Sequence, residues 1–166
     1  MADDQAQALR GFAAVATEFC ELIDSSDEFQ RNVFFEKLAV SLARICEAGV
    51  LLPLVEPATD DAADGDSPKS HAERCFEISK RLKALLGDID LYWLVFDATE
   101  PEEPIQSTLS NDLAEIYMDL RESLRSIQSD SEENDILWGC RFAFRTHWGR
   151  HASGALRFIL SSVFDF

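Results

Sequence analysis

The pattern that most constrains the fold is a run of apolar residues between positions 109 and 127, spaced by alternating steps of four and three. Residues at this spacing share one face of a helix, and the pattern is typical of a seam between packed helices. The opposite side of the segment is acidic and is predicted to face solvent. The seam consists of Leu109, Leu113, Ile116, Leu120, Leu124 and Ile127, and the acids are Asp112, Glu115, Asp119 and Glu122. We therefore expect an amphipathic helix inside a helix bundle.

The same helical spacing recurs in four further segments, which predicts an all-α, single-domain bundle of about five helices over residues 1–166. With 166 residues, the chain is long enough for one domain with a full hydrophobic core. Gly49 and Gly87 are each predicted to end a helix, because glycine adopts positive φ without steric cost. The four segments cover residues 9–23, 29–45, about 68–86 and about 136–163.

Three segments between these helices are predicted to be non-helical or are ambiguous. Residues 56–67 and 97–106 are acidic, contain proline and are predicted to be loops. The segment Leu91–Phe96 is apolar on both alternating faces, which fits either a short buried strand or a short helix. Because no partner strand is evident elsewhere, we favour a helical turn or an extended plug.

The charge of the chain limits its partners. Acidic residues outnumber basic ones by 31 to 15, and the formal net charge is −16. This charge disfavours nucleic acid and anionic membranes, so we expect a small anion or another protein as the partner. The sequence shows neither a signal peptide nor an apolar run of the roughly 18 residues that span a membrane, which predicts a cytoplasmic protein. The oligomeric state is not predicted.

The segment 136–160 differs from the rest of the chain because its charge is inverted. It contains four arginines and no acidic residue. These side chains could form ion pairs with the acidic side of the helix at 109–127, since a guanidinium group binds a carboxylate with two hydrogen bonds. Alternatively, they could form a binding site for a phosphate or carboxylate. The arginines are Arg141, Arg145, Arg150 and Arg157.

His147 and His151 lie one helical turn apart in the same segment, on one face of the predicted helix. This spacing allows two imidazoles to bind one metal ion, and Glu115 with Asp119 could supply carboxylate ligands from the neighbouring helix. Alternatively, the pair could be a hydrogen-bonded part of the core. Gly149 and Gly154 interrupt this helix, which indicates that another backbone or a ligand approaches closely.

Several blocks in the C-terminal half of the chain resemble a bacterial family of small, acidic, helical proteins, the domain-of-unknown-function family DUF5063. The most specific block is the sequence HWGRHA at positions 147–152, which matches the ending HWGxHA of the family. The other blocks are Tyr92–Asp97, Asp112–Leu120 and the aromatic residues Trp138 and Phe142. The resemblance implies a helical fold and draws attention to the two histidines, but it implies no activity.

We predict that the chain is a non-catalytic binding or interaction module with a polar, aromatic-lined site around the HWGRH segment. The sequence contains none of the GxSxG, P-loop or GxGxxG motifs. We expect the two histidines to lie in a pocket against Tyr117 or the segment 92–96. The predicted ligand-binding residues are His147, His151, Arg145, Arg141, Trp148, Tyr117 and Trp93.

Two enzymatic alternatives remain open. In the first, a divalent metal ion held by the histidines and the carboxylates lowers the pKa of a bound water, which then acts as the nucleophile. In the second, Arg141 with His147, or Arg145 with His151, acts on RNA. Five residues separate each pair, and this spacing resembles the Arg–His motif of the helical nucleases named after higher-eukaryote and prokaryote nucleotide-binding domains. The acidic charge of the chain disfavours the second alternative.

Overall fold

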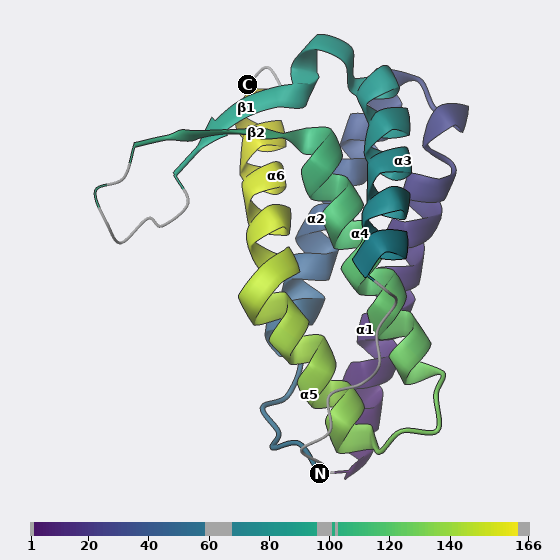
Figure 1. The fold of residues 1–166 in the computed structure, drawn as a ribbon. Coiled ribbons are helices and arrows are strands. Elements are labelled where there is room, and N and C mark those ends of the chain that lie inside the picture. Colours follow the sequence, from purple (N-terminus) through teal and green to yellow (C-terminus); the bar gives the residue numbers. More distant parts are fainter. Residues whose placement is uncertain (1, 59–67, 96–100, 102, 163–166) are drawn as a thin grey trace.

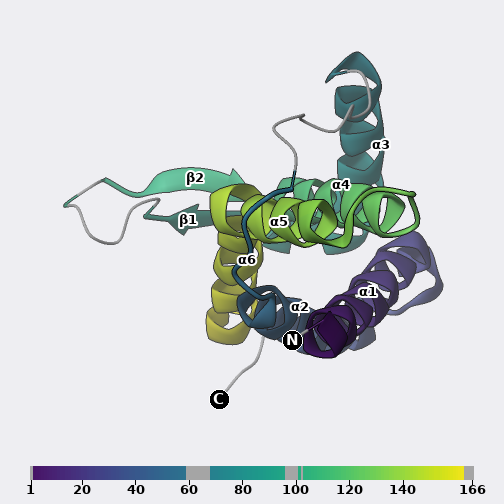
Figure 2. The same cartoon turned by 90° about the horizontal axis from the view of Figure 1, so that it is seen from below.

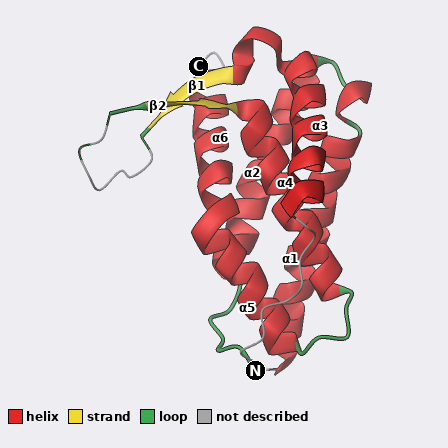
Figure 3. Cartoon of the chain, in the orientation of Figure 1, coloured by secondary structure: helices red, strands yellow, loops and turns green. Residues whose placement is uncertain are grey.

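Five helices build the part of the chain that the computed structural model describes, which comprises residues 2–58, 68–95, 101 and 103–162. Figure 3 shows how far helices dominate. The fifth helix is one continuous segment in which α5 passes through the π-helical turn η3 into α6. The bounds are α1 Ala2–Asp24, α2 Arg31–Leu51, α3 Pro68–Leu86, α4 Leu109–Ile127, α5 Glu133–Ala143, η3 Phe144–Trp148 and α6 Gly149–Ser162, with short 3₁₀ helices η1 Ser26–Glu28 and η2 Gly87–Asp90.

Four of the helices form a closed ring around the core. Helix α1 packs against α2 and α4, and α6 packs against α2 and α4, while α3 lies outside the ring against α4 (Figures 1 and 2). The seam predicted on α4 lies at the centre, since Leu109, Leu113, Ile116 and Leu120 are fully buried. The all-α bundle is therefore confirmed. None of the described helices combines the length and the apolar character needed to cross a membrane.

The segment predicted at 91–96 differs from its prediction over residues 91–95, and residue 96 lies outside the described residues. Leu91–Leu94 is strand β1, and it pairs antiparallel with strand β2, Ile105–Thr108. The partner strand falls partly inside the predicted loop 97–106, where residues 97–100 and 102 lie outside the described residues, as do residues 59–67 of the other predicted loop. Both strands are only four residues long, and β2 (IQST) lacks apolar alternation, so the sequence signal was weak. The hairpin extends beside the end of α6 (Figure 1).

The two predicted helix-ending glycines have different outcomes. Gly87 follows α3 with a φ of 62°, as predicted. Gly49 is not a helix end, because α2 continues to Leu51. A Cβ atom at Gly49 would lie 2.6 Å from the Phe144 ring, so this glycine makes room for an aromatic side chain of the fifth helix.

Candidate functional site

A π-helical turn sets the orientation of the residues around the HWGRH segment. The N–H of Gly149 donates to the carbonyl of Phe144, five residues earlier, where an α-helix would use the residue four earlier. Trp148 is fully buried in the core, between Phe12 and Phe144. His147 and His151, on another side of the helix, face α4. Single π-turns of this kind are frequent at functional sites.

The buried carboxylate of Asp112 organises the first half of the site. Asp112 is 2% exposed, and it accepts hydrogen bonds from three elements of the fold. The Nδ1 atom of His151 lies 2.8 Å from its Oδ1 atom, the Ser107 hydroxyl lies 3.3 Å from the same atom, and the Tyr92 hydroxyl donates to Oδ2. Asp112 thus joins α6, β2 and β1 to α4.

A second Asp–His pair lies beside the first. The Nδ1 atom of His147 is 2.7 Å from Oδ2 of Asp119, whose side chain is 14% exposed. The two imidazole rings are 4.9 Å apart between centroids, with planes inclined by 73°. Each ring turns its Nδ1 edge toward a carboxylate of α4. The Nε2 atom of each ring is not the atom that contacts the carboxylate.

The histidines line a cavity of about 730 Å³ between α6 and the β1–β2 hairpin. The wall formed by α6 also carries Arg150 and Arg157. The lining also has an aromatic part: the ring of Tyr92 on β1 stacks on that of Phe158 on α6, with centroids 4.6 Å apart. Trp93 lines the cavity and remains 66% exposed. The cavity therefore combines basic groups, two oriented imidazoles and flat apolar surfaces.

Four of the predicted ligand-binding residues lie elsewhere. Trp148 belongs to the core, and the hydroxyl of Tyr117 donates to Asp24 on α1 over 2.9 Å. Arg141 donates to the carbonyl of Leu52 after α2, and Arg145 is exposed outside the cavity. The structure thus brings together His147, His151 and Trp93, and it places the histidines against the hairpin rather than against Tyr117.

The cavity is also lined by Asp112, Phe158, Arg150 and Arg157, which the sequence analysis did not select. Tyr92 lies in the segment 92–96, one of the two places where the sequence analysis expected the pocket wall. Asp112 was predicted to be exposed, and the structure corrects this because the hairpin and α6 cover it. A usable signal was the spacing of Asp112 and Asp119, which are two helical turns apart on one face. On the acidic side of α4, His147 pairs with Asp119 and His151 pairs with Asp112.

The four predicted metal ligands do not converge. Within the part of the chain that the structure describes, no three His, Cys, Asp or Glu side chains form a group that could hold a metal ion. Asp119 contacts the Nδ1 edge of His147, on the side of the ring away from the cavity. Glu115 lies beside Cys75 of α3, and burial together with this carboxylate raises the pKa of the Cys75 thiol to about 12.

The Asp–His pairs make stability depend on pH. The hydrogen bond to Asp112 raises the pKa of His151, although burial opposes this shift. The folded state therefore binds more protons than the unfolded state above pH ~6.5, the ordinary histidine value. This contribution is complete below that pH and is lost as pH rises through the folded pKa. Burial likewise raises the pKa of Asp119, against the effect of His147, so it too favours the folded state at lower pH.

We expect the free energy of unfolding of the wild-type chain to fall more steeply, as the pH rises above ~6.5, than that of the His151→Asn variant. Asparagine keeps an N–H donor for Asp112 but cannot titrate. Urea unfolding at several pH values in the presence of EDTA measures both curves. Equal slopes for the two proteins would contradict the prediction.

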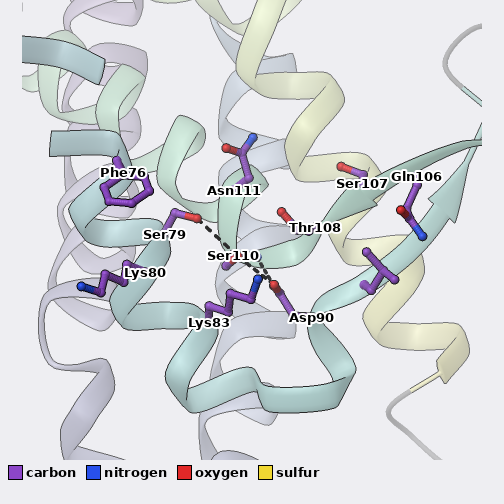
Figure 4. A pocket seen from close by; sticks show the side chains of 11 residues that line it. Phe76, Ser79, Lys80, Lys83, Asp90, Gln106, Ser107, Thr108, Ser110 and Asn111 are labelled. Carbon is purple, nitrogen blue, oxygen red and sulfur yellow. Dashed lines mark hydrogen bonds between the residues drawn. The ribbon is translucent and has the colours of Figure 1, made fainter. Parts of the chain in front are cut away.

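A second cavity, of about 580 Å³, lies between α3, the hairpin and the start of α4. Figure 4 shows that its buried acid, Asp90, is bonded within the protein: it accepts hydrogen bonds from the N–H of Ser110 at 2.7 Å and from its hydroxyl at 3.0 Å. The Ser79 hydroxyl of α3 lies 3.4 Å from that of Ser110. Asp90 thereby satisfies a free N–H of the first turn of α4. These hydrogen bonds connect the helices, so the polar groups of this second cavity have a structural role.

Comparisons with known proteins agree with this fold. The chain matches the model of the family described as "Domain of unknown function (DUF5063)" over residues 3–165. Its structure is similar to the crystal structure of protein BF1032 from Bacteroides fragilis, with a TM-score of 0.76 and 22% sequence identity over 96% of this chain and 94% of that chain. At this identity the likeness concerns the fold alone. No curated protein matches the chain.

Proposed function

The chain belongs to the DUF5063 family, and we propose that it is a binding module for a small anionic ligand. The ligand occupies the cavity between α6 and the hairpin. The observation that carries the proposal is the pairing of a basic wall with an aromatic wall around one cavity. The basic wall consists of Arg150, Arg157 and the two histidines. The aromatic wall consists of Tyr92 and Trp93 on the hairpin, and it is continued by Phe158, which lies on α6 beside Arg157.

The charge distribution supports an anion as the ligand. The protein has a net charge of −16, but the segment 136–160 that supplies the basic wall contains no acidic residue. Within the described residues, Arg157 forms no ion pair, so its guanidinium group is available to bind a carboxylate or phosphate in a bidentate manner. The acidic remainder of the surface would repel competing polyanions such as nucleic acids.

The aromatic wall supports a ligand that also has a flat apolar part. Tyr92 is buried and stacks on Phe158 with planes inclined by 14°, so these two rings form an apolar part of the lining. Trp93 lies on the hairpin, where two thirds of its surface is exposed. A planar group seated here would remove apolar surface from water, at about 25 cal/mol per Å² buried. A small aromatic or heterocyclic anion therefore fits both walls.

We expect phenyl phosphate to bind and to quench or shift the fluorescence of Trp93, and we expect Arg157→Gln to weaken its binding about tenfold. The reason is the loss of a charge-assisted hydrogen bond, worth about 1.5–3 kcal/mol. Isothermal titration calorimetry measures the affinity. The matched control is Arg10→Gln, because Arg10 is exposed on α1, outside the cavity.

Two results would contradict this proposal. One is equal weakening of phenyl phosphate binding by Arg157→Gln and Arg10→Gln, which would indicate a nonspecific charge effect. The other is equal affinity for phenyl phosphate and for uncharged benzyl alcohol, which would show that the cavity binds only the ring. The Arg–His nuclease alternative has less support, because Arg141 is engaged by Leu52 and Arg145 lies outside the cavity that His151 lines.

A further inference from the structure

We infer that His147 and His151 form a two-histidine site for a divalent transition-metal ion of the Zn²⁺ class on the wall of this cavity. The ion is bound by the two Nε2 atoms, and its remaining coordination positions face the cavity. The inference that the anionic ligand completes the coordination rests on the proposed function. The metal site itself rests on the geometry of the two rings.

The separation of the imidazole rings suits one shared ion. A Zn–N bond is about 2.0–2.1 Å, which places the ion ~3.2 Å from each ring centroid. When both Nε2 atoms point at one ion, the observed 4.9 Å between the centroids of His147 and His151 corresponds to an N–Zn–N angle of ~100°, close to the tetrahedral value that Zn²⁺ prefers. Two histidines one turn apart on a helix commonly provide such a pair of ligands.

The carboxylates of α4 occupy the positions that support metal-binding histidines. Such a histidine usually donates its second ring N–H to a carboxylate, which fixes the tautomer and the ring orientation. Here Asp119 lies 2.7 Å from Nδ1 of His147, and Asp112 lies 2.8 Å from Nδ1 of His151. These contacts favour the tautomer that leaves a lone pair on each Nε2 atom. Asp119, which the sequence analysis predicted to be a metal ligand, is instead inferred to orient the ligand His147.

The coordination positions that the two histidines leave free face the same cavity as the basic wall. The described residues supply two ligands and no third one. An ion held by two histidines retains positions for water or for an exogenous anion, as catalytic zinc sites do with their open position. Arg157 and Arg150 line the same cavity, so an anion bound to the ion can place its other oxygens near their guanidinium groups.

The test uses Zn²⁺ alone, added to the tag-free full chain after treatment with EDTA and removal of the chelator. Competition with a chromophoric chelator measures the affinity, and the visible spectrum of the Co²⁺ form reports the coordination geometry. We expect one ion per chain, with His147→Gln and His151→Gln each weakening binding about 100-fold. The control is His71→Gln, which changes the third histidine of the chain; His71 lies outside the cavity and influences Asp119 electrostatically, so this variant should weaken binding far less than the other two.

A further variant tests whether the carboxylate that contacts a histidine contributes to metal binding. Asp119→Asn keeps a hydrogen-bond acceptor but removes the charge, and it should weaken Zn²⁺ binding about tenfold or more. The inference is overturned if Asp119→Asn leaves the affinity unchanged, or if the His71→Gln variant loses as much affinity as the other two. Phenyl phosphate that binds equally well with and without EDTA would leave the anion site standing and remove the role of the metal in it.

Discussion

Replacing Asp112 with alanine is expected to lower the free energy of unfolding by about 3 kcal/mol. The carboxylate is buried and accepts hydrogen bonds from Tyr92, His151 and Ser107. Removing one partner of a buried, hydrogen-bonded charge costs about 3–5 kcal/mol, because the other partners lose their only compensation for desolvation. We place the value at the low end because His151 is partly exposed and can rehydrate.

The same substitution should also loosen the cavity, since Asp112 connects the hairpin and α6 to α4. Urea unfolding measures the loss of stability, and hydrogen exchange of the β1 and β2 amides measures the loosening. Tyr92→Phe removes a single donor and should cost only about 1 kcal/mol. Asp130→Ala, in the exposed turn after α4, should change stability by less than about 0.5 kcal/mol. A cost for Asp112→Ala no larger than that of Asp130→Ala would contradict this account.

The helical framework and the face that carries the histidines could be predicted because both follow from spacing along one helix. The seam on α4 begins and ends at the predicted residues, Leu109 and Ile127, and its central positions are fully buried. His147 and His151 are neighbours on the fifth helix, as residues four apart must be. Local periodicity decides these features, so tertiary contacts did not have to be known.

The features that escaped prediction depend on contacts between distant segments. Asp112 is charged and lies on the polar side of α4, and only the arrival of the hairpin and α6 makes it buried. Strand β1 could not be assigned without β2, whose four residues carry no strand pattern of their own. The choice of Arg150 and Arg157 over Arg141 and Arg145 depends on how the fifth helix is rotated, and the π-turn at 144–148 changes that rotation.

Close contacts explain why the fifth helix contains glycine at positions 149 and 154, although glycine is unfavourable inside a helix. A Cβ atom at Gly149 would lie 2.5 Å from the Phe144 carbonyl oxygen and 2.8 Å from its ring, and one at Gly154 would lie 3.3 Å from the Tyr92 hydroxyl. The first glycine therefore accommodates the turn itself, and the second accommodates the hairpin. The sequence predicted the approach of another backbone or of a ligand, but the observed contacts are with Phe144 of the same continuous helix and with the Tyr92 side chain.

Gly149→Ala is therefore expected to destabilise the protein by about 3 kcal/mol, which corresponds to a fall in Tm of about 6–12 °C for a chain of this size. The clash is with a backbone carbonyl, so rotation of a side chain cannot relieve it. Relief would require the π-turn to rearrange, which would turn His147 away from Asp119. Thermal unfolding measures the first effect, and loss of Zn²⁺ affinity measures the second.

The matched control is Gly139→Ala in the same continuous helix, where a Cβ atom would meet nothing within 4 Å. This change should stabilise the protein by up to about 1 kcal/mol, the ordinary gain of alanine over glycine in a helix. Gly49→Ala provides an intermediate case, because its contact at 2.6 Å is with the Phe144 ring, which the substitution Phe144→Leu removes. Phe144→Leu should therefore rescue Gly49→Ala but not Gly149→Ala. Rescue of both variants would show that the ring, rather than the carbonyl of the π-turn, requires glycine at position 149.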